Sequence, residues 1–369
     1  MRLTRIETFA TRDIGFVRVT DETGAQGWGQ VSTYQSDLTA AVLHRQIAPH
    51  VLGVEFEDAD DLFDRAAEKE HKFPGSYIAR AIAGVDTALW DLKGKQAGVP
   101  VATLLGGSPG PLRAYASSMK RDITPKDEAE RFRRLRGEHG FDAFKFRIGA
   151  ECGRGQDEWE GRTEEIIPTI AKTFASEDVS LLVDANSCYA PKAAIHYGHM
   201  LQDNGIVHYE EPCPYWELEQ TAEVTAALEI DVTGGEQDCW LPTWKQMFEL
   251  SAVNVAQPDV LYVGGIGRML KVARLAQDHG LPVTPHAANL GLVTLFTMHV
   301  LRAIPNAGPY LEFSIEEADY YPWQYGLYRN EPYVVSGGQV TVTEAPGWGV
   351  EISDEWLAKS EYRVSEAAA

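Results

Sequence analysis

Three carboxylates stand at equal intervals in the middle of the chain. Asp184, Glu210 and Glu236 are spaced 26 residues apart, and each follows a short apolar run that is typical of a strand. If one interval is one strand and one helix, the three side chains lie side by side on a single rim. Carboxylates so close repel one another unless a cation lies among them, and an all-oxygen set with open positions suits Mg²⁺. We therefore predict that these residues bind one Mg²⁺ ion.

The run HYEEPCP, residues 208–214, places two glutamates next to each other. Successive strand residues face opposite sides, so only one of Glu210 and Glu211 can point into the space above the strand. Strand alternation alone does not show which of the two glutamates points into this space, but the equal spacing of the three carboxylates favours Glu210.

Basic and acidic residues at other strand-like runs could handle protons. Lys145 and Arg147, in FKFR, are two residues apart and so share one strand face. Asp259, in QPD, and His286, in TPHA, are 27 residues apart. An Asp that accepts from one imidazole nitrogen orients the ring and raises its basicity. Glu312, in YLE, could donate a hydrogen bond if its pKa is raised, and we predict catalytic roles for all five residues.

These residues need a scaffold that presents strand ends on one rim. From Arg113 onward, helical stretches alternate with eight short apolar runs: RAYASS, DAFKFR, SLLVDAN, IVHYEE, IDVTGGE, VNVAQPD, PVTPH and PYLEF. Eight such repeats predict an α/β fold with a (β/α)8-type barrel over residues 113–325, whose chemistry lies at the carboxyl ends of the strands. Residues 1–112 read as an α+β capping domain, to which residues 326–369 are expected to return.

Composition limits the classes of partner. The 369 residues carry a net charge of −21, which repels nucleic acid and anionic membrane surfaces. No apolar run reaches the length of a membrane helix, and the start lacks the apolar core of a secretory signal. We expect a cytoplasmic protein that binds a small carboxylate. Its cysteines lack metal-site spacing and are expected to be reduced: Cys152, Cys188, Cys213 and Cys239.

Together the motifs resemble those of the enolase superfamily, in its mandelate racemase subgroup. The resemblance covers nearly the whole chain and rests on GVDTALWDLKGKQAGVPVATLLGG, KFR, VDAN, YEEP, GGEQ, PDV followed by GGIGR, and TPH. It implies removal of the proton α to a carboxylate, giving an enediolate stabilised by Mg²⁺. It also implies a homo-oligomer, either a dimer or an octamer. By resemblance the metal ligands are Asp184, Glu210 and Glu236, Glu211 braces the strand from the other side, and the remaining functional positions are Lys145, Asp259, His286 and Glu312.

One position departs from the family pattern. Racemases of the family use the second lysine of a KxK motif as a base opposite the histidine, whereas this chain has Arg147. A guanidinium keeps its proton near neutrality and instead binds carboxylates or hydroxyls in a fixed fork. Dehydration can run with His286 as the single base, so we predict a dehydratase that converts an acid sugar into a 2-keto-3-deoxy acid. A racemase or epimerase is the alternative, because a buried arginine can exceptionally act as a base.

Substrate specificity is expected from loops that the capping domain lays over the barrel, at residues 11–15, 32–37 and 71–77. Lys120 and Arg121, just past the first barrel strand, are further candidates for contacts with hydroxyls or a distal carboxylate. The insert ECGRGQDEWEGR, residues 151–162, is longer than a βα loop needs. It either reaches over the site or lies on the surface.

Two other functions compete with these predictions. One is a barrel that binds a ligand without turnover, which would require a lost metal ligand or base. The other is a phosphate site at GGIGR, residues 264–268. Phosphate sites in barrels usually follow the seventh and eighth strands, whereas this run follows the sixth.

Overall fold

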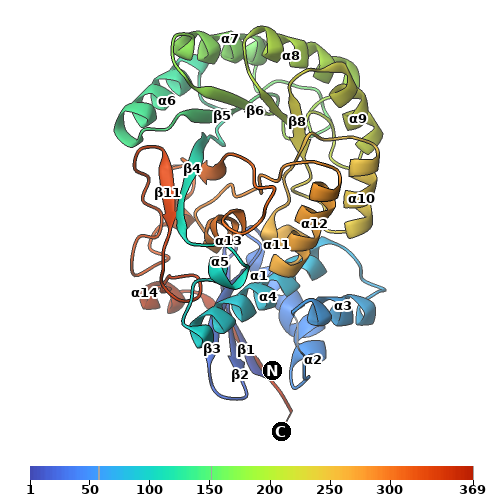
Figure 1. Ribbon diagram of the computed structural model, residues 1–369, viewed down its shortest axis with the longest axis vertical. Helices are drawn as coiled ribbons and strands as arrows, with labels where there is room; N and C mark the ends of the chain where they lie inside the picture. Colours follow the sequence, from blue (N-terminus) through green and yellow to red (C-terminus); the bar gives the residue numbers. More distant parts are fainter. Residues whose placement is uncertain (57–58, 151, 369) are drawn as a thin grey trace.

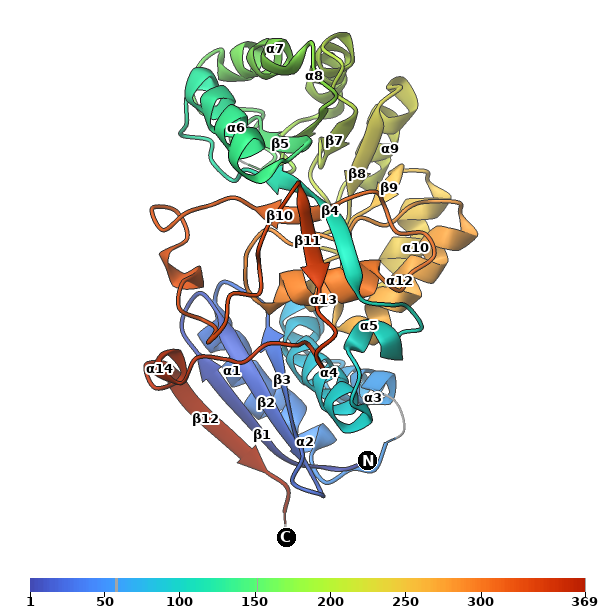
Figure 2. The same cartoon turned by 60° about the vertical axis from the view of Figure 1, so that its left-hand side comes forward.

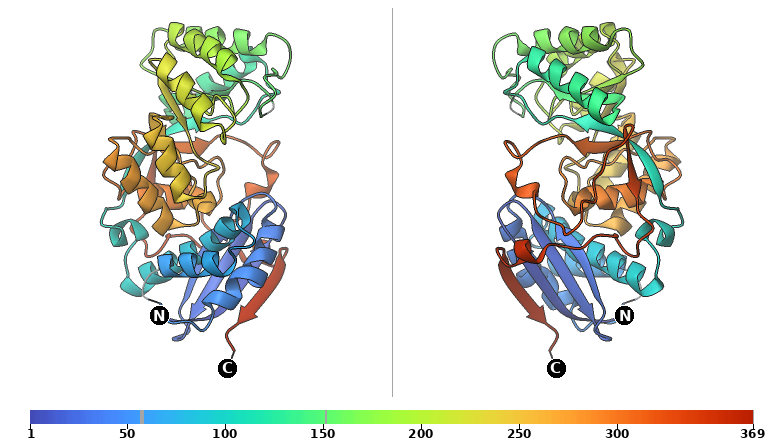
Figure 3. Two further views of the ribbon diagram at one scale, coloured as in Figure 1. Left: turned by 90° about the vertical axis from the view of Figure 1, so that its right-hand side faces the viewer. Right: turned by 90° about the vertical axis from the view of Figure 1, so that its left-hand side faces the viewer.

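The computed structural model describes residues 1–56, 59–150 and 152–368. Figure 1 shows two units, a ring of strands surrounded by helices and, below it, a sheet covered by helices. Both chain ends lie beside the lower sheet, as the side views of Figure 3 also show. Among the described residues, no helix combines the length and apolar character needed to cross a membrane.

The lower unit is built on an antiparallel sheet that joins the two ends of the chain. Asp21 forms its tight turn, because Oδ1 accepts hydrogen bonds from the backbone N–H groups of Thr23 (2.8 Å) and Ala25 (3.0 Å). The last strand of the chain completes this open sheet by pairing with the first strand along its edge. In spatial order its strands are β12 (Glu361–Glu366), β1 (Leu3–Ala10), β2 (Gly15–Asp21) and β3 (Gln26–Val31).

Helices cover one face of this sheet. The long helix α4 (Ser76–Ala97) packs directly on β3. A glycine is required at the contact, since a Cβ at Gly27 would lie 2.1 Å from the backbone oxygen of Ala88. The other helical segments of this unit are α1 (Ser36–Val42), the π-helix η1 (Leu43–Ile47), α2 (Ala48–Val51), α3 (Ala59–Lys69) and α5 (Val101–Leu104).

The upper unit is a barrel of parallel strands, which confirms the predicted fold class. Its strands follow one another in chain order, and the last pairs with the first to close the ring. They are β4 (Gly110–Ser117), β5 (Ala143–Arg147), β6 (Ser180–Asp184), β7 (His208–Glu210), β8 (Asp231–Gly234), β9 (Val255–Ala256) and β10 (Leu311–Ser314).

The seventh predicted strand, PVTPH at residues 282–286, is not a regular strand. Val283 makes only isolated parallel bridges, to Ala256 and Ala307. Pro282 and Pro285, which flank Val283 and Thr284 within this segment, lack a backbone N–H. A longer ladder of hydrogen bonds therefore cannot form there.

Helices alternate with the strands until the last repeat. They are α6 (Pro125–His139), α7 (Arg162–Phe174), α8 (Pro191–Asp203), α9 (Leu218–Ala227), α10 (Leu241–Glu249), α11 (Val260–Val263), α12 (Ile266–Asp278) and α13 (Leu292–Leu301). After β10 comes only a 3₁₀ turn, η2 (Pro322–Gln324), so the prediction of eight βα repeats was wrong for the last one. The chain then forms β11 (Gln339–Val342), which runs antiparallel beside β4 (Figure 2), and α14 (Asp354–Leu357) precedes β12.

Alternation along β5 directs the predicted site residues inward. Phe144 stacks between Phe132 of α6 and Phe174 of α7, with ring centroids 4.8 and 5.2 Å away. Because this side chain faces the outer helices, Lys145 and Arg147 face the inside of the barrel.

Candidate active site

Lys145 lies at the centre of an acidic rim. Its Nζ is 2.7 Å from Oε2 of Glu210, 2.8 Å from Oε1 of Glu312 and 3.6 Å from Oδ2 of Asp184. Burial opposes the charge of this amine, but Glu210 and Glu312 outweigh burial and raise the pKa of Lys145 well above its usual value. Lys145 is therefore an ammonium group that binds carboxylates.

Arg147 holds the next part of the rim. Its Nη1 donates to Oδ2 of Asp184, its Nε donates to the backbone oxygen of Ser118 at 3.2 Å, and its Nη2 lies 2.7 Å from Sδ of Met119. Burial disfavours the guanidinium charge, yet Asp184 and the other rim carboxylates raise the pKa of Arg147 above its already high value. This residue keeps its proton and acts as a donor.

The three predicted metal ligands meet on neighbouring strands. Asp184 and Glu210 are register partners at the ends of β6 and β7, and Glu236 follows the end of β8. All three are buried. Burial raises the pKa of Asp184 and Glu236 more than Arg147 and His286 lower it, and the charge of Glu210 adds to the rise. The negative charges of the three side chains therefore repel one another across the rim.

This donor set fits a hard divalent cation. Every donor is a carboxylate oxygen, and positive charge at their meeting point relieves the repulsion. In the part of the chain that the structure describes, no three Asp, Glu, His or Cys side chains stand close enough to hold a metal ion as they are placed. Lys145 and Arg147 lie against these oxygens and supply compensating charge.

The predicted pair of His286 and Asp259 is in contact. Nδ1 of His286 lies 2.8 Å from Oδ2 of Asp259, and Nε2 faces Oε2 of Glu236 at 3.3 Å. Burial lowers the pKa of His286, but the charge of Glu236 and the hydrogen bond to Asp259 raise it well above its usual value. The free nitrogen of the ring therefore points at the acidic rim.

Glu312 does not donate a hydrogen bond. Its Oε1 accepts from Oγ of Ser117 and Nζ of Lys145, each at 2.8 Å, and its Oε2 accepts from the backbone N–H of Ala287 at 2.8 Å. Burial acts to raise the pKa of Glu312, but Lys145 and His286 lower it below its usual value. The condition for donation, a raised pKa, is therefore not met, because three donors already stabilise the ionised form.

Glu211 turns away from Glu210 toward the neighbouring loop. Its backbone has a φ of 42°, and its Oε2 accepts from Oγ of Ser187 at 3.2 Å. The insert 151–162 packs on this same loop, because Gly153 donates its backbone N–H to the oxygen of Ser187 at 2.8 Å. The first residue of the insert, Glu151, lies outside the described residues.

Sequence reasoning missed two buried side chains that support Glu210. Gln257 donates from Nε2 to Oε2 of Glu210 at 3.0 Å, and Nε2 of His208 lies 3.5 Å from the same oxygen. Each stands two residues before a predicted site residue, His208 before Glu210 and Gln257 before Asp259. Strand alternation places such residues on the same face, and this signal was available in the sequence.

The capping domain reaches the rim through Arg80 of α4. Its guanidinium donates to Oγ of Ser32 (2.6 Å) and Oε1 of Gln237 (3.2 Å), and its carbon Cζ lies 3.4 Å from the ring centroid of Tyr262. Gln237 in turn donates to Oε1 of Glu236 at 3.0 Å. The predicted segment 32–37 is therefore connected to a candidate metal ligand.

The other predicted specificity segments differ in their placement. In segment 32–37, the hydroxyl of Tyr34 lies 2.7 Å from that of Tyr321, and Asp13 of segment 11–15 accepts from the backbone N–H of Tyr34. Segment 71–77 is largely exposed, with Phe73 68% exposed.

The two basic candidates that follow β4 point to different neighbours. Arg121 donates to Oδ1 of Asn186 at 3.2 Å, on the loop that follows Asp184. Lys120 instead pairs with Asp319 at 2.6 Å. Of these two residues, the structure therefore places Arg121 nearer the acidic rim.

The glycine-rich run at residues 264–268 contacts the capping domain. Oδ1 of Asp86, on α4, accepts from the backbone N–H of Ile266 at the start of α12. A Cβ at Gly265 would lie 2.2 Å from that oxygen. A protein carboxylate thus occupies the helix N-terminus where a phosphate would bind.

A capped barrel with an acidic rim and a histidine–aspartate pair defines a class of enzymes. Two family models match this chain. "Mandelate racemase / muconate lactonizing enzyme, N-terminal domain" matches residues 3–106, and "Enolase C-terminal domain-like" matches residues 127–356. The chain belongs to the enolase superfamily, in the mandelate racemase/muconate lactonizing enzyme family.

Curated relatives include two enzymes of different reaction types. An arabinonate dehydratase from Saccharolobus solfataricus is 30% identical over 90% of this chain and 86% of its own length. A D-galactarolactone cycloisomerase from Agrobacterium fabrum is 33% identical over 78% of this chain and 74% of its own length.

Solved structures share the whole architecture. One from Roseobacter denitrificans, provisionally described as a racemase, is 66% identical, with a TM-score of 0.98 over 99% of this chain and 100% of the other. A mandelate racemase/muconate lactonizing protein from Paracoccus denitrificans, complexed with magnesium, is 28% identical, with a TM-score of 0.88 over 99% and 98% of the two chains.

Proposed function

We propose that this enzyme is a Mg²⁺-dependent dehydratase of an acid sugar, an aldonate or aldarate, and forms a 2-keto-3-deoxy acid. The relation to arabinonate dehydratase supports the substrate class. The acidic rim, the His286–Asp259 pair and the cationic pair of Lys145 and Arg147 support the reaction type.

Asp184, Glu210 and Glu236 would hold the metal ion. Their all-oxygen donor set supports this assignment, as does the magnesium complex of the Paracoccus denitrificans relative. When bound, Mg²⁺ supplies positive charge that stabilises the negative charge which a carboxylate substrate gains as its α-proton leaves.

The observation that carries the dehydratase proposal is that, among the described residues at the rim, His286 is the one group placed to accept a proton. Asp259 orients His286 through Nδ1 and turns Nε2 toward the rim, 3.3 Å from Oε2 of Glu236. The charge of Glu236 raises the pKa of the ring, and a cation bound to Glu236 would offset that charge. Two carboxylates keep Lys145 in its charged form, and Arg147 forms an ion pair with Asp184. A single base suffices for elimination, whereas inversion at the α-carbon needs one on each face.

In the proposed reaction, Nε2 of His286 takes the α-proton of the substrate carboxylate. The electron pair of that C–H bond first passes to the substrate's carboxylate, which becomes an enediolate. It then returns to form the C–C double bond of an enol as the β-carbon–oxygen bond breaks. The same Nε2 returns its proton to the departing hydroxyl, so water leaves and the base is regenerated. Tautomerisation of the enol then gives the 2-keto-3-deoxy acid. Lys145 and Arg147 bind the substrate's oxygens during these steps.

A racemase or epimerase is the second candidate. It is favoured by the provisional description of the Roseobacter denitrificans relative, which is 66% identical. This function requires Arg147 to exchange protons, although its pKa is raised rather than lowered by the rim.

Screening the enzyme with Mg²⁺ against aldonic and aldaric acids in D₂O, followed by proton NMR, separates the two functions. The dehydratase proposal expects 2-keto acid to form, α-proton exchange from one face only, and no build-up of the α-epimer. An α-epimer that accumulates as fast as the keto acid, or faster, would overturn the proposal in favour of the racemase.

A further inference from the structure

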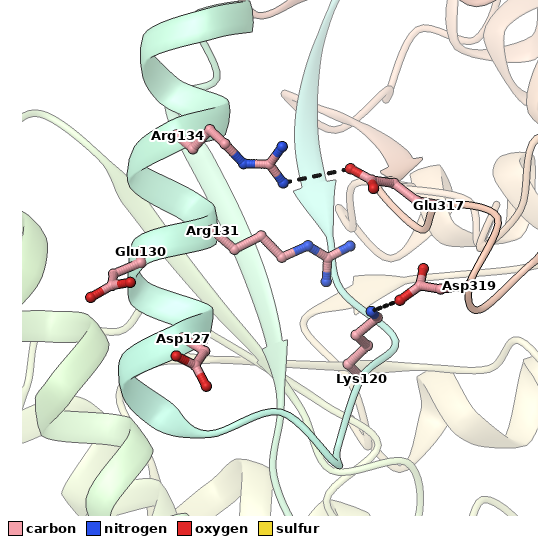
Figure 4. A pocket seen from close by; sticks show the side chains of 7 residues that line it. All are labelled: Lys120, Asp127, Glu130, Arg131, Arg134, Glu317 and Asp319. Atoms are coloured by element: carbon pink, nitrogen blue, oxygen red, sulfur yellow. Dashed lines mark hydrogen bonds and ion pairs between the residues drawn. The ribbon is translucent and has the colours of Figure 1, made fainter.

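The barrel's first and last strands are followed by segments that ion pairs hold together. A cleft of about 370 Å³ lies between α6 and the segment after β10, and Figure 4 shows the side chains that line it. On its walls Arg134 pairs with Glu317 at 3.5 Å and Lys120 pairs with Asp319 at 2.6 Å. Both pairs are open to solvent, because at least one side chain of each pair is more than half exposed. Between them lies Arg131, whose side chain is only 10% exposed.

Arg131 makes contacts that its exposed neighbour Arg134 does not share. Its Nη2 donates to Oε2 of Glu316 at 3.1 Å and to the backbone oxygen of Ile315 at 2.6 Å. Its Nη1 donates to Oγ of Ser118 at 3.2 Å. Arg131 thus binds the segment after β10 and the segment after β4 at the same time.

Glu316 extends this connection toward the active site. Its side chain is fully buried, and its Oε1 accepts the backbone N–H of Met119 at 2.7 Å. Ser118 and Met119 contact the guanidinium of Arg147 from outside the acidic rim, through the oxygen of Ser118 at 3.2 Å and Sδ of Met119 at 2.7 Å. One continuous chain of contacts therefore runs from Arg131 through Glu316 to Arg147.

We propose that Arg131 and Glu316 are positioning residues that fix the guanidinium of Arg147 in the orientation that binds the substrate's carboxylate. The inference rests on the proposed function of Arg147 as a substrate-binding group. The exposed pairs nearby already join the same segments, so closing the barrel does not require a buried pair. A buried pair is retained here because its side chains hydrogen-bond to Ser118 and Met119, whereas the side chains of the exposed pairs bond only to each other and Lys120 reaches Ser118 through its backbone N–H alone.

The test compares Arg131→Met with Arg134→Met, which removes a charge of the same kind from the same helix. Oxalate serves as a non-reacting dicarboxylate probe, and its binding in the presence of Mg²⁺ is measured by titration calorimetry. We expect Arg131→Met to weaken binding about tenfold, the effect of losing one well-placed charge-assisted hydrogen bond, and Arg134→Met to leave it unchanged. With a substrate found by the screen, Arg131→Met should raise KM more than it lowers kcat.

A double-mutant cycle shows whether Arg131 acts through Arg147. The losses from Arg131→Met and Arg147→Lys should be strongly non-additive in the double variant, because removing the second residue of one pathway costs little more. Equal affinity of Arg131→Met and Arg134→Met for oxalate, or additive losses in the cycle, would overturn the proposal.

Two further measurements keep the proposal testable if binding or folding fails. Glu316→Gln keeps an oxygen for Met119 but loses the charge that pairs with Arg131, and it should show the same weakening in a milder form. A crystal structure of Arg131→Met should show Arg147 displaced from Ser118, and an unmoved Arg147 would refute the inference. Oxalate does not turn over, so a failure of the dehydratase proposal leaves these outcomes intact.

Discussion

Nδ1 of His286 lies 2.8 Å from Oδ2 of Asp259, and the other oxygen of Asp259 accepts the backbone N–H groups of Leu261 and Tyr262 at 2.7 and 3.0 Å. An ionised carboxylate only accepts hydrogen bonds, so the proton of the neutral ring sits on Nδ1. The backbone N–H groups at the start of α11 therefore orient the carboxylate of Asp259. That carboxylate in turn orients the ring of His286 so that Nε2 faces the acidic rim. In the proposed reaction, Nε2 is therefore the ring atom that takes and returns the proton.

Replacing His286 by Asn should therefore lower kcat by at least about 10²-fold, the usual contribution of a general base. Asp259→Asn should cost less, because it misorients the ring without removing it. Both variants should still bind oxalate with Mg²⁺, as calorimetry would show. Turnover that is nearly normal in His286→Asn would mean that another group takes the α-proton.

Glu236→Gln should abolish turnover and weaken Mg²⁺ binding while the fold persists. A ligand that binds only the native state stabilises it by about 2.7 kcal/mol at a hundredfold excess over its dissociation constant. The thermal midpoint of the unmutated enzyme should therefore rise with Mg²⁺, and that of Glu236→Gln should rise much less. The exposed Glu229→Gln is the matched control and should respond like the unmutated enzyme. An equal response of all three proteins would remove Glu236 from the metal site.

Arg147→Lys should weaken substrate binding, because lysine keeps the charge but loses the fork that contacts Asp184, Ser118 and Met119. The variant should also gain slow epimerisation, since an amine beside a second cation can lose its proton near neutrality whereas a guanidinium cannot. Proton NMR of the α-carbon in D₂O measures both effects. Unchanged KM together with absent epimer would contradict this account of Arg147.

His299 makes stability depend on pH far from the active site. Its Nδ1 accepts the backbone N–H of Ala102 at 2.9 Å, and burial lowers the pKa of His299 to about 4. In the unfolded chain histidine titrates near 6.5, so below that pH the unfolded chain binds a proton that the folded chain does not. The stabilisation is complete above pH of about 6.5 and is lost as the pH falls toward 4, by up to roughly 3 kcal/mol.

Urea unfolding at pH 7.5 and pH 5 measures this loss. His299→Gln should be less stable than the unmutated enzyme at pH 7.5 but should lose less stability on acidification. The exposed His199→Gln is the control and should keep the full pH dependence. Burial also lowers the pKa of His44 to about 4, so part of the acid sensitivity should persist in either variant. Identical pH dependence in His299→Gln and His199→Gln would exclude this role for His299.

Gly265→Ala should destabilise the contact between α4 and the barrel. The new Cβ would lie 2.2 Å from Oδ1 of Asp86, on a backbone with a φ of 111°. Strain of this kind costs about 1–3 kcal/mol, measurable as a fall in the free energy of unfolding. Gly137→Ala, in α6, meets no atom within 4 Å and should instead stabilise by up to about 1 kcal/mol. A neutral Gly265→Ala would show that this contact relaxes freely.

Much of the site follows from local rules. Alternation along FKFR placed Lys145 and Arg147 on one face, and the even spacing of Asp184 and Glu210 indicated neighbouring strand ends, where the structure makes them register partners. The same alternation would have found His208 and Gln257, had it been applied beyond the residues first singled out. These inferences work because strand geometry repeats every two residues and each βα unit returns the chain to the same rim.

Other features depend on contacts between distant parts of the chain. The charge state of Glu312 was left open by the sequence because it depends on Lys145 and Ser117, more than 160 residues earlier in the chain. The missing last helix and the interrupted seventh strand were likewise not expected from the repeating pattern.

The sequence by itself determined the chemical groups, their order around the barrel and the departure at Arg147. Only the tertiary structure decided which carboxylates neutralise Lys145, that Arg80 reaches Gln237 across the two units, and that Arg131 connects to Arg147. The reason is physical. A side chain's face is set by its neighbours in the chain, whereas its charge state and partners are set by burial and by whatever groups the fold packs against it.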